Sequence, residues 1–247
     1  MKKFLTVAGN DSCGGAGAGA DMRVATRHGL FSASVITALT AQTKSRVRGV
    51  LLTPPEFVER QLDAAFGDGA PDAVKIGMLG NAEIADTVAR KLLEYGAKNI
   101  VLDTVFASSS GYELLSKEGI AVLKEKLLPI CRCFTPNIPE AEILSDMKIN
   151  GKQDMEKCAA KLFKISASDV IITGGHSENE CDDLLFANGE ITWFSGEKIK
   201  GASVHGTGCA FSSCLACNLA LGRSLKESVK ISKDYVLRKI KCEIGGL

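Results

Sequence analysis

The chain has 247 residues, of which 45% are hydrophobic and 24% are charged, and its formal net charge at pH 7 is +1. This length predicts one domain covering residues 1–247, and the near-zero charge argues against nucleic acid as a partner. There is no uninterrupted apolar run of about 18 residues, so we expect no membrane span. The apolar run at the N-terminus is too short for a signal peptide, so we expect a cytoplasmic protein whose nine cysteines are reduced.

Short apolar runs alternate with amphipathic runs along most of the chain. The expected strands are 3–8, 34–40, 73–76, 100–102, 132–134 and 170–173. The expected helices are 18–28, 55–66, 83–95, 114–127, 139–144 and 154–164. This alternation predicts right-handed βαβ units, and hence an α/β protein with a mostly parallel central sheet and helices on both faces.

The pattern changes toward the C-terminus. Segments 182–186 and 191–194 flank Asn188-Gly189, a strong hairpin signal that predicts a small antiparallel edge before two last helices, 208–221 and 225–242. Ligands of such sheets collect at the carboxyl ends of the parallel strands. We therefore expect the site in the loops that follow Ala8, Thr40, Ile76, Leu102, Phe134 and Thr173.

The loop of residues 9–21 follows the first expected strand and contains Gly15-x-Gly17-x-x-Ala20, a loose match to the dinucleotide-binding fingerprint. No acidic residue occurs between Asp21 and Glu56, so the carboxylate that would hold a ribose hydroxyl is missing. An NAD-dependent oxidoreductase is therefore a disfavoured alternative. A turn that only packs a helix is the other alternative.

A second glycine turn, residues 204–209, precedes a small-residue apolar run and predicts the start of a buried helix. Unpaired N–H groups and the helix dipole favour an anion there, and Gly206 and Gly208 allow the ligand to approach. A thiol at a helix N-terminus commonly has a lowered pKa. We therefore expect Cys209 to accept a proton beside a phosphate site.

Three polar side chains follow expected strands on the ligand side. Asp103 and Glu140 could hold Mg²⁺ against nucleotide phosphates, because that ion prefers carboxylate, water and phosphate oxygens. For Glu140 the alternative is a helix N-terminal charge. Gln42 carries an amide that can both donate to and accept from the edge of a heteroaromatic ring.

The chain strongly resembles the hydroxymethylpyrimidine/phosphomethylpyrimidine kinases of thiamine biosynthesis, in the ribokinase-like superfamily. The motifs that carry the resemblance lie, in order, at residues 8–17, 34–42, 75–79, 135–141 and 205–209. The resemblance implies a ribokinase-like three-layer α/β/α domain, usually a homodimer. It also implies transfer of the γ-phosphate of ATP to the hydroxymethyl group of a pyrimidine and then to the monophosphate.

The resemblance also implies roles for individual residues. Gln42 would grip the aminopyrimidine edge, and the residues around it would be Gly9, Asp21, Met78 and Val105. Mg²⁺ would be held by Asp103 and Glu140, and the nucleotide would be bound by Asn137, Glu140, Thr173, Gly175 and Thr207. Cys209 would take the place of the aspartate base of sugar kinases, with Gly206 and Gly208 in the oxyanion turn.

The chain also departs from the family pattern. Thr173 stands where the family usually has a lysine, which leaves Lys75 or Lys200 as substitutes, Gly19 replaces a glutamine, and the C-terminal tail is short. Two further alternatives therefore remain open at this stage. They are a pyridoxal kinase of the same superfamily and a pyrimidine-binding protein that has lost catalysis.

Overall fold

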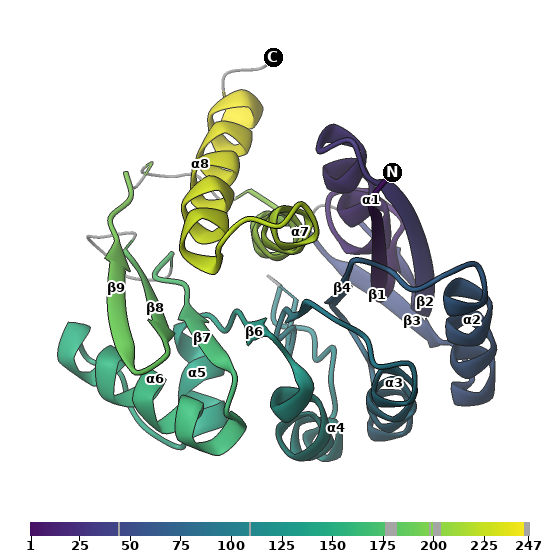
Figure 1. Cartoon of the computed structure of the whole chain (residues 1–247), viewed down its shortest axis with the longest axis horizontal. Helices are drawn as coiled ribbons and strands as arrows, with labels where there is room; N and C mark the ends of the chain where they lie inside the picture. Colours follow the sequence, from purple (N-terminus) through teal and green to yellow (C-terminus); the bar gives the residue numbers. More distant parts are fainter. Residues whose placement is uncertain (44, 109, 176–181, 198, 200–203, 245–247) are drawn as a thin grey trace.

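The computed structural model describes residues 1–43, 45–108, 110–175, 182–197, 199 and 204–244 (Figure 1). Within these residues nine strands form one sheet in the order β3-β2-β1-β4-β5-β6-β7-β8-β9. The strands are β1 Lys3–Asp11, β2 Phe31–Gln42, β3 Val47–Leu52, β4 Ala73–Ile76, β5 Ile100–Leu102, β6 Cys133–Phe134, β7 Asp169–Ile172, β8 Asp183–Ala187 and β9 Glu190–Phe194. Strands β2, β1, β4, β5, β6 and β7 pair in parallel, whereas β3 pairs antiparallel with β2, and β8 and β9 add an antiparallel edge at the other side.

Helices cover both faces of the sheet. They are α1 Gly17–Arg27, α2 Pro55–Gly67, α3 Ala82–Glu94, α4 Lys117–Val122, α5 Ile138–Ser145, α6 Lys152–Ser166, α7 Thr207–Ala220 and α8 Leu225–Ile244, with two short helical segments, Leu123–Leu127 and Leu128–Ile130, after α4. Helices α1, α7 and α8 lie on one face and the others on the opposite face (Figure 1). Of the helices in the described residues, none combines the length and apolarity that a membrane span needs.

Neighbouring strand residues divide between two cores because side chains alternate along a strand. On β1, Leu5 and Val7 pack into the cluster with α2 and α3, whereas Phe4 packs into the cluster with α1 and α7. Most residues of both clusters are fully buried, as expected for a parallel sheet that is covered by helices on both faces. The expectation of a three-layer α/β/α fold with a small antiparallel edge is confirmed.

The structure differs from the expected elements at several boundaries, such as the start of β2 at Phe31. Three differences have a clear physical reason. Strand β3 was not predicted, because its only signal is a short apolar run and the turn before it lacks a tight hairpin dipeptide. Strand β1 runs past Ala8 to Asp11, because Asn10 and Asp11 resume pairing with β2 after a bulge. Helix α4 begins at Lys117 rather than at Leu114, since the Ser116 hydroxyl caps it by accepting the N–H of Gly119.

A buried ion pair joins the sheet to the helices on one face. Lys75 of β4 and Asp21 of α1 are both fully buried, and the Lys75 Nζ atom lies 2.9 Å from Asp21 Oδ2. Hydroxyls of Thr6 on β1 and Ser213 on α7 donate to the same carboxylate at 2.6 and 2.7 Å. Burial alone would lower the pKa of Lys75, but the Asp21 charge and its neighbours outweigh burial and raise that pKa, so the ammonium stays charged.

Breaking this pair from one side should destabilise the fold strongly. We expect Lys75→Met to lower the free energy of unfolding by about 3–5 kcal/mol, because it leaves the Asp21 carboxylate buried without its counter-charge. The double variant Lys75→Met/Asp21→Asn removes both charges and should recover a large part of that loss. Urea unfolding followed by circular dichroism measures both values, and a double variant no more stable than Lys75→Met would contradict the ion-pair account.

Candidate active site

A cavity of about 830 Å³ opens at the carboxyl ends of the parallel strands, next to the first turn of α7 and one side of α8. Each of the six expected loops contributes to its lining, through Gly9, Gln42, Met78, Asp103, Asn137 and Thr173. The other predicted site residues that line it are Val105, Glu140, Gly175, Gly206, Thr207, Gly208 and Cys209. The structure therefore brings nearly all of the predicted site residues to one cavity.

Asp21 is the exception among the predicted site residues. Its side chain is fully buried behind the cavity wall, and its carboxylate is occupied by Lys75, Thr6 and Ser213. The expectation that Asp21 surrounds the substrate is not met, because the Lys75 ammonium on β4 draws the carboxylate into the interior. Asp21 holds α1 in place and does not face the cavity.

The two glycine turns of the site pack backbone against backbone. Gly206 has a φ of 78°, and a Cβ atom there would collide with the carbonyl oxygen of Gly15. Gly17 has a φ of 62°, and its Cβ atom would collide with the carbonyl oxygen of Gly9. Positive φ and missing Cβ space both require glycine, so Gly206 lets the start of α7 contact the loop before α1, and Gly17 lets the start of α1 contact β1.

The start of α7 offers backbone donors to the cavity. Its N-cap, Gly206, provides no side chain, and the helical bonds begin with the Ala210 N–H, which donates to the Gly206 carbonyl at 3.0 Å. The N–H groups of Thr207, Gly208 and Cys209 therefore have no acceptor within the helix. Together with the positive end of the helix dipole, these N–H groups make this part of the cavity wall suited to an anion.

The Cys209 thiol lies at the meeting point of the two helix starts. Burial raises its pKa to about 12, and the Asp103 and Asp21 carboxylates raise it further, while the Lys75 charge and the Gly17 N–H act in the opposite direction. The expectation of a lowered pKa is wrong, because the helix terminus and Lys75 do not offset burial beside two carboxylates. Cys209 is a neutral thiol at pH 7 in the protein without ligands.

Asp103 and Glu140 are two buried carboxylates in the middle of the cavity wall. Asp103 Oδ2 accepts from the Ser212 hydroxyl at 3.0 Å, and burial raises the pKa of this carboxyl. Glu140 accepts from the N–H of Asn137 and the hydroxyl of Thr104, both at 2.9 Å. Burial, and to a smaller extent the charge of Asp103, raise the pKa of Glu140 to about 7.

Both interpretations of Glu140 are compatible with this geometry. The Asn137 side chain accepts from the N–H of Glu140 at 2.9 Å, which completes a capping box at the start of α5. The same carboxylate lines the cavity close enough to Asp103 for their charges to oppose each other. A divalent cation would relieve that repulsion, and carboxylate oxygens are donors that Mg²⁺ accepts, so this pair fits Mg²⁺.

The far end of the cavity contains Asn137, Thr173 and Gly175, together with a lysine that the sequence reasoning missed. Lys75 lines the cavity between Asp21 and Asp103, with its ammonium 2.9 Å from Asp21 and 3.9 Å from Asp103, whereas Lys200 and His176 lie outside the described residues. Lys233 of α8 lines this end and lies 2.7 Å from Asp183, whose other oxygen accepts the Gly174 N–H at 2.9 Å. No motif marks Lys233 in the sequence, since it belongs to an ordinary amphipathic helix.

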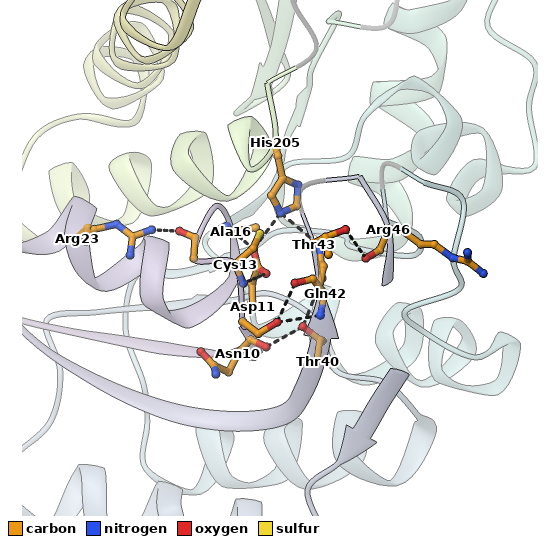
Figure 2. Close-up of polar contacts among 12 residues, drawn as sticks. Asn10, Asp11, Cys13, Ala16, Arg23, Thr40, Gln42, Thr43, Arg46 and His205 are labelled. Carbon is orange, nitrogen blue, oxygen red and sulfur yellow. Dashed lines mark hydrogen bonds and ion pairs between the residues drawn. The ribbon is translucent and has the colours of Figure 1, made fainter. Parts of the chain in front are cut away.

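A second missed pair links the two glycine turns beside Gln42 (Figure 2). His205 Nε2 lies 2.9 Å from Asp11 Oδ2 and 3.2 Å from the Gln42 amide. Burial would raise the pKa of Asp11, but the hydrogen bonds from His205, from the Cys13 side chain and from the backbone outweigh burial and lower it. Asp11 and His205 each lie inside a recognised motif, yet nothing in the sequence pairs residues so far apart.

Asp11, His205 and Cys13 also place three metal-ligand atoms within 4.8 Å of one another. Their carboxylate, imidazole and thiol form a mixed set that suits softer cations, whereas Mg²⁺ prefers oxygen. Of the two groupings, Asp103 with Glu140 therefore fits Mg²⁺ better.

Comparison with known proteins gives a consistent result. The model of a family described as phosphomethylpyrimidine kinase matches residues 11–246. The chain is 41% identical over 238 residues to the hydroxymethylpyrimidine/phosphomethylpyrimidine kinase of Aquifex aeolicus, covering 96% of this chain and 93% of that protein. It is also 41% identical to the thiamine biosynthesis bifunctional protein ThiED of Geobacter sulfurreducens, of which it spans about half, 49% of the length.

Solved structures show the same similarity. The crystal structure of phosphomethylpyrimidine kinase from Clostridium difficile matches with a TM-score of 0.88 and 36% identity, covering 98% of this chain and 100% of that chain. Pyridoxal kinase from Staphylococcus aureus in complex with AMP-PCP and pyridoxal matches with a TM-score of 0.88 and 31% identity, covering 98% and 88%. These matches confirm the expected ribokinase-like fold.

Proposed function

Because the chain belongs to the phosphomethylpyrimidine kinase family, phosphotransferases of thiamine biosynthesis, we propose that its 247 residues act as one kinase domain. This domain uses ATP to phosphorylate 4-amino-5-hydroxymethyl-2-methylpyrimidine and then its monophosphate. One observation supports this proposal above the others. Gln42, the anion site at the start of α7, and the paired carboxylates Asp103 and Glu140 all line the same cavity. A ring, a migrating phosphoryl group and a magnesium nucleotide need these three features side by side.

We place the acceptor at the Gln42 end of the cavity. The Gln42 amide faces the ring edge there, and Gly9, Met78 and Val105 provide surface around the ring. A Cβ atom at Gly9 would lie 2.9 Å from the Met78 sulfur, so a larger residue there would displace the Met78 side chain. Asp21 contributes indirectly, by fixing the start of α1 through Lys75.

We place the nucleotide at the opposite end, where Asn137, Thr173, Gly175 and Thr207 line the cavity. Asp103 and Glu140 would hold Mg²⁺, which neutralises developing charge on the phosphates when it is bound. The N–H groups of Thr207 to Cys209 then face the position where negative charge grows during transfer. Positioning and charge stabilisation by these residues supply most of the catalysis in reactions of this kind.

The pyrimidine alcohol must lose a proton as it attacks phosphorus, and we assign that proton to Cys209. Because the resting thiol is neutral, it must first release its own proton to water, and the Lys75 charge and the Gly17 N–H stabilise the thiolate that then takes the proton of the alcohol. In the second transfer the acceptor is already a phosphate anion. That step should therefore depend on positioning more than on a base.

The assignment of the substrate is tested by ADP release. We expect ATP- and Mg²⁺-dependent turnover with the hydroxymethylpyrimidine and with its monophosphate, at a kcat/KM well above that with pyridoxal. Turnover with pyridoxal alone would favour the pyridoxal kinase alternative. That alternative is kept because the fold is similar to the pyridoxal kinase of Staphylococcus aureus. Pyrimidine binding without any phosphorylation would instead identify a protein that has lost catalysis.

The role of Cys209 has its own test. Cys209→Ala should lower the first transfer by roughly 10²–10⁴-fold, the usual effect of a positioned general base, and should leave pyrimidine binding intact. Because the pKa of Cys209 lies near 12, the thiolate fraction of the unmodified protein rises tenfold for each pH unit between neutral and alkaline pH. The first transfer should rise in the same way, and the variant should lose this slope. A pH-independent rate in the unmodified protein would show that Cys209 is not the base.

We also propose that the protein is cytoplasmic. Within the described residues, Cys131, Cys133, Cys158, Cys209, Cys214, Cys217 and Cys242 are free thiols, which is typical of a reducing compartment. Mass spectrometry of protein alkylated directly in cell lysate would show these cysteines modified, and disulfide-linked peptides in that sample would refute the proposal.

We further propose a homodimer that uses the β2–β3 edge of the sheet. Leu39 and Leu51 face each other across these strands and are 50% and 68% exposed, an apolar surface that a second copy would cover. Leu51→Asp should therefore convert a dimer to a monomer in sedimentation equilibrium, with Ile143→Asp on α5, 53% exposed, as the matched control. A monomer at every concentration of the unmodified protein would refute the dimer.

A further inference from the structure

We propose that Asp11 and His205 are positioning residues that fix which way round the Gln42 amide faces the cavity, and thereby which way round the aminopyrimidine ring binds. The inference rests on the proposed function for the substrate. For the amide itself it rests only on hydrogen bonds within the protein. Figure 2 shows the three side chains converging from the end of β1, from the end of β2 and from the turn before α7.

The proton on His205 is located by Asp11. The Asp11 carboxylate accepts the N–H of Cys13 at 3.0 Å through Oδ1 and the N–H of Ala16 at 2.9 Å through Oδ2. These hydrogen bonds keep the carboxylate ionised, so it can only accept. His205 Nε2, which lies 2.9 Å from Oδ2, must therefore carry a hydrogen and donate it.

This proton determines the nearer atom of the Gln42 amide. The structure places Gln42 Nε2 3.2 Å from His205 Nε2, but a ring nitrogen that carries hydrogen cannot accept from an NH₂ group, so we assign this position to the amide oxygen instead. An amide oxygen and nitrogen are told apart by their partners rather than by their shape. The His205 N–H is then shared between the Asp11 carboxylate and the Gln42 carbonyl oxygen.

A second contact gives the same answer independently. The structure places Gln42 Oε1 3.4 Å from the Thr40 hydroxyl, but that hydroxyl has a single hydrogen and donates it to the nearer Asn10 carbonyl at 3.0 Å. A hydroxyl whose hydrogen is committed can only accept, so this end of the amide must be the NH₂ group. The amide is thus oriented with its oxygen toward His205 and its nitrogen toward Thr40.

The position of the imidazole is itself fixed. Its ring packs over the glycine loop, where a Cβ atom at Gly15 would lie 2.5 Å from His205 Cδ2. The His205 carbonyl accepts from Lys239 of α8 at 3.0 Å. The His205 N–H donor therefore stays in place. If the Gln42 amide turned round, its NH₂ group would point at this N–H, and two donors would face each other.

This orientation determines how the ring is placed. Gln42 offers its oxygen on the His205 side and its NH₂ group on the Thr40 side. The oxygen can accept from the exocyclic amino group of the ring, and the NH₂ group can donate to the adjacent ring nitrogen. In the proposed substrate the hydroxymethyl group is attached on the other side of the amino-bearing carbon from that nitrogen. The alcohol therefore extends past His205 toward the turn from Gly206 to Cys209, where the anion site lies, whereas a reversed amide would direct it away.

The test uses an analogue with the opposite pattern. Replacing the 4-amino group by a 4-oxo group places an acceptor where the donor was and an N–H where the ring nitrogen was. We expect the unmodified protein to favour the amino compound by about 10²-fold or more in kcat/KM, because a site built for one hydrogen-bonding pattern rejects the other. In His205→Leu the amide is free to turn, and the preference should fall by at least about tenfold.

Two variants serve as controls for this measurement. His205→Gln restores an N–H donor and should keep the preference, and Cys13→Ala removes another contact to Asp11, at 3.3 Å, without touching the amide and should also keep it. An equal loss for both compounds in His205→Leu, with the preference unchanged, would overturn the inference. Absence of turnover with the amino compound in the unmodified protein would overturn the proposed function instead.

A measurement without turnover tests the amide directly. In protein labelled with ¹⁵N at glutamine side chains, the Gln42 NH₂ protons should show nuclear Overhauser effects to the Thr40 side chain. The Gln42 signal is identified by its loss in Gln42→Glu. Effects to the His205 ring protons, in place of those to Thr40, would overturn the inference whatever the substrate.

Discussion

The geometry of the cavity depends on the buried contact between Lys75 and Asp21. This ion pair connects a central strand to α1, and the hydroxyls of Thr6 and Ser213 extend it to β1 and α7. The first turns of α1 and α7 are thereby held at a fixed separation, with the sulfur of Cys209 between them. A fully buried ion pair is tolerated only when both charges are satisfied, so it fixes one arrangement of these elements.

Groups that resist negative charge lie in the cavity next to groups that favour it. Asp103, Glu140 and Cys209 all have raised pKa values, chiefly because burial disfavours their charged forms. The unpaired N–H groups of α7 face the same space and favour negative charge. In the proposed reaction a magnesium nucleotide would supply a cation to the carboxylates and an anion to the amides.

The sequence alone predicted the architecture well, because the alternation of apolar and amphipathic runs reflects burial on both faces of a parallel sheet. It missed β3, whose pairing depends on tertiary contact with β2. Nearly all of the site residues that it named line the cavity, because parallel strands deliver their carboxyl ends to one edge. It misjudged Asp21 and Cys209, since burial depends on neighbours from other elements, and it could not pair Asp11 with His205 across 194 positions.

The contact between the two glycine turns limits how this protein can diverge. Where two side chains clash, a smaller neighbour can relieve the overlap. At Gly206 and Gly17, however, the opposing atoms are the carbonyl oxygens of Gly15 and Gly9, which every amino acid carries. No compensating replacement exists, so a homologue that adopts another acceptor must keep these turns and alter the surrounding wall. The framework for phosphoryl transfer and the recognition of the ring are thus free to evolve at different rates.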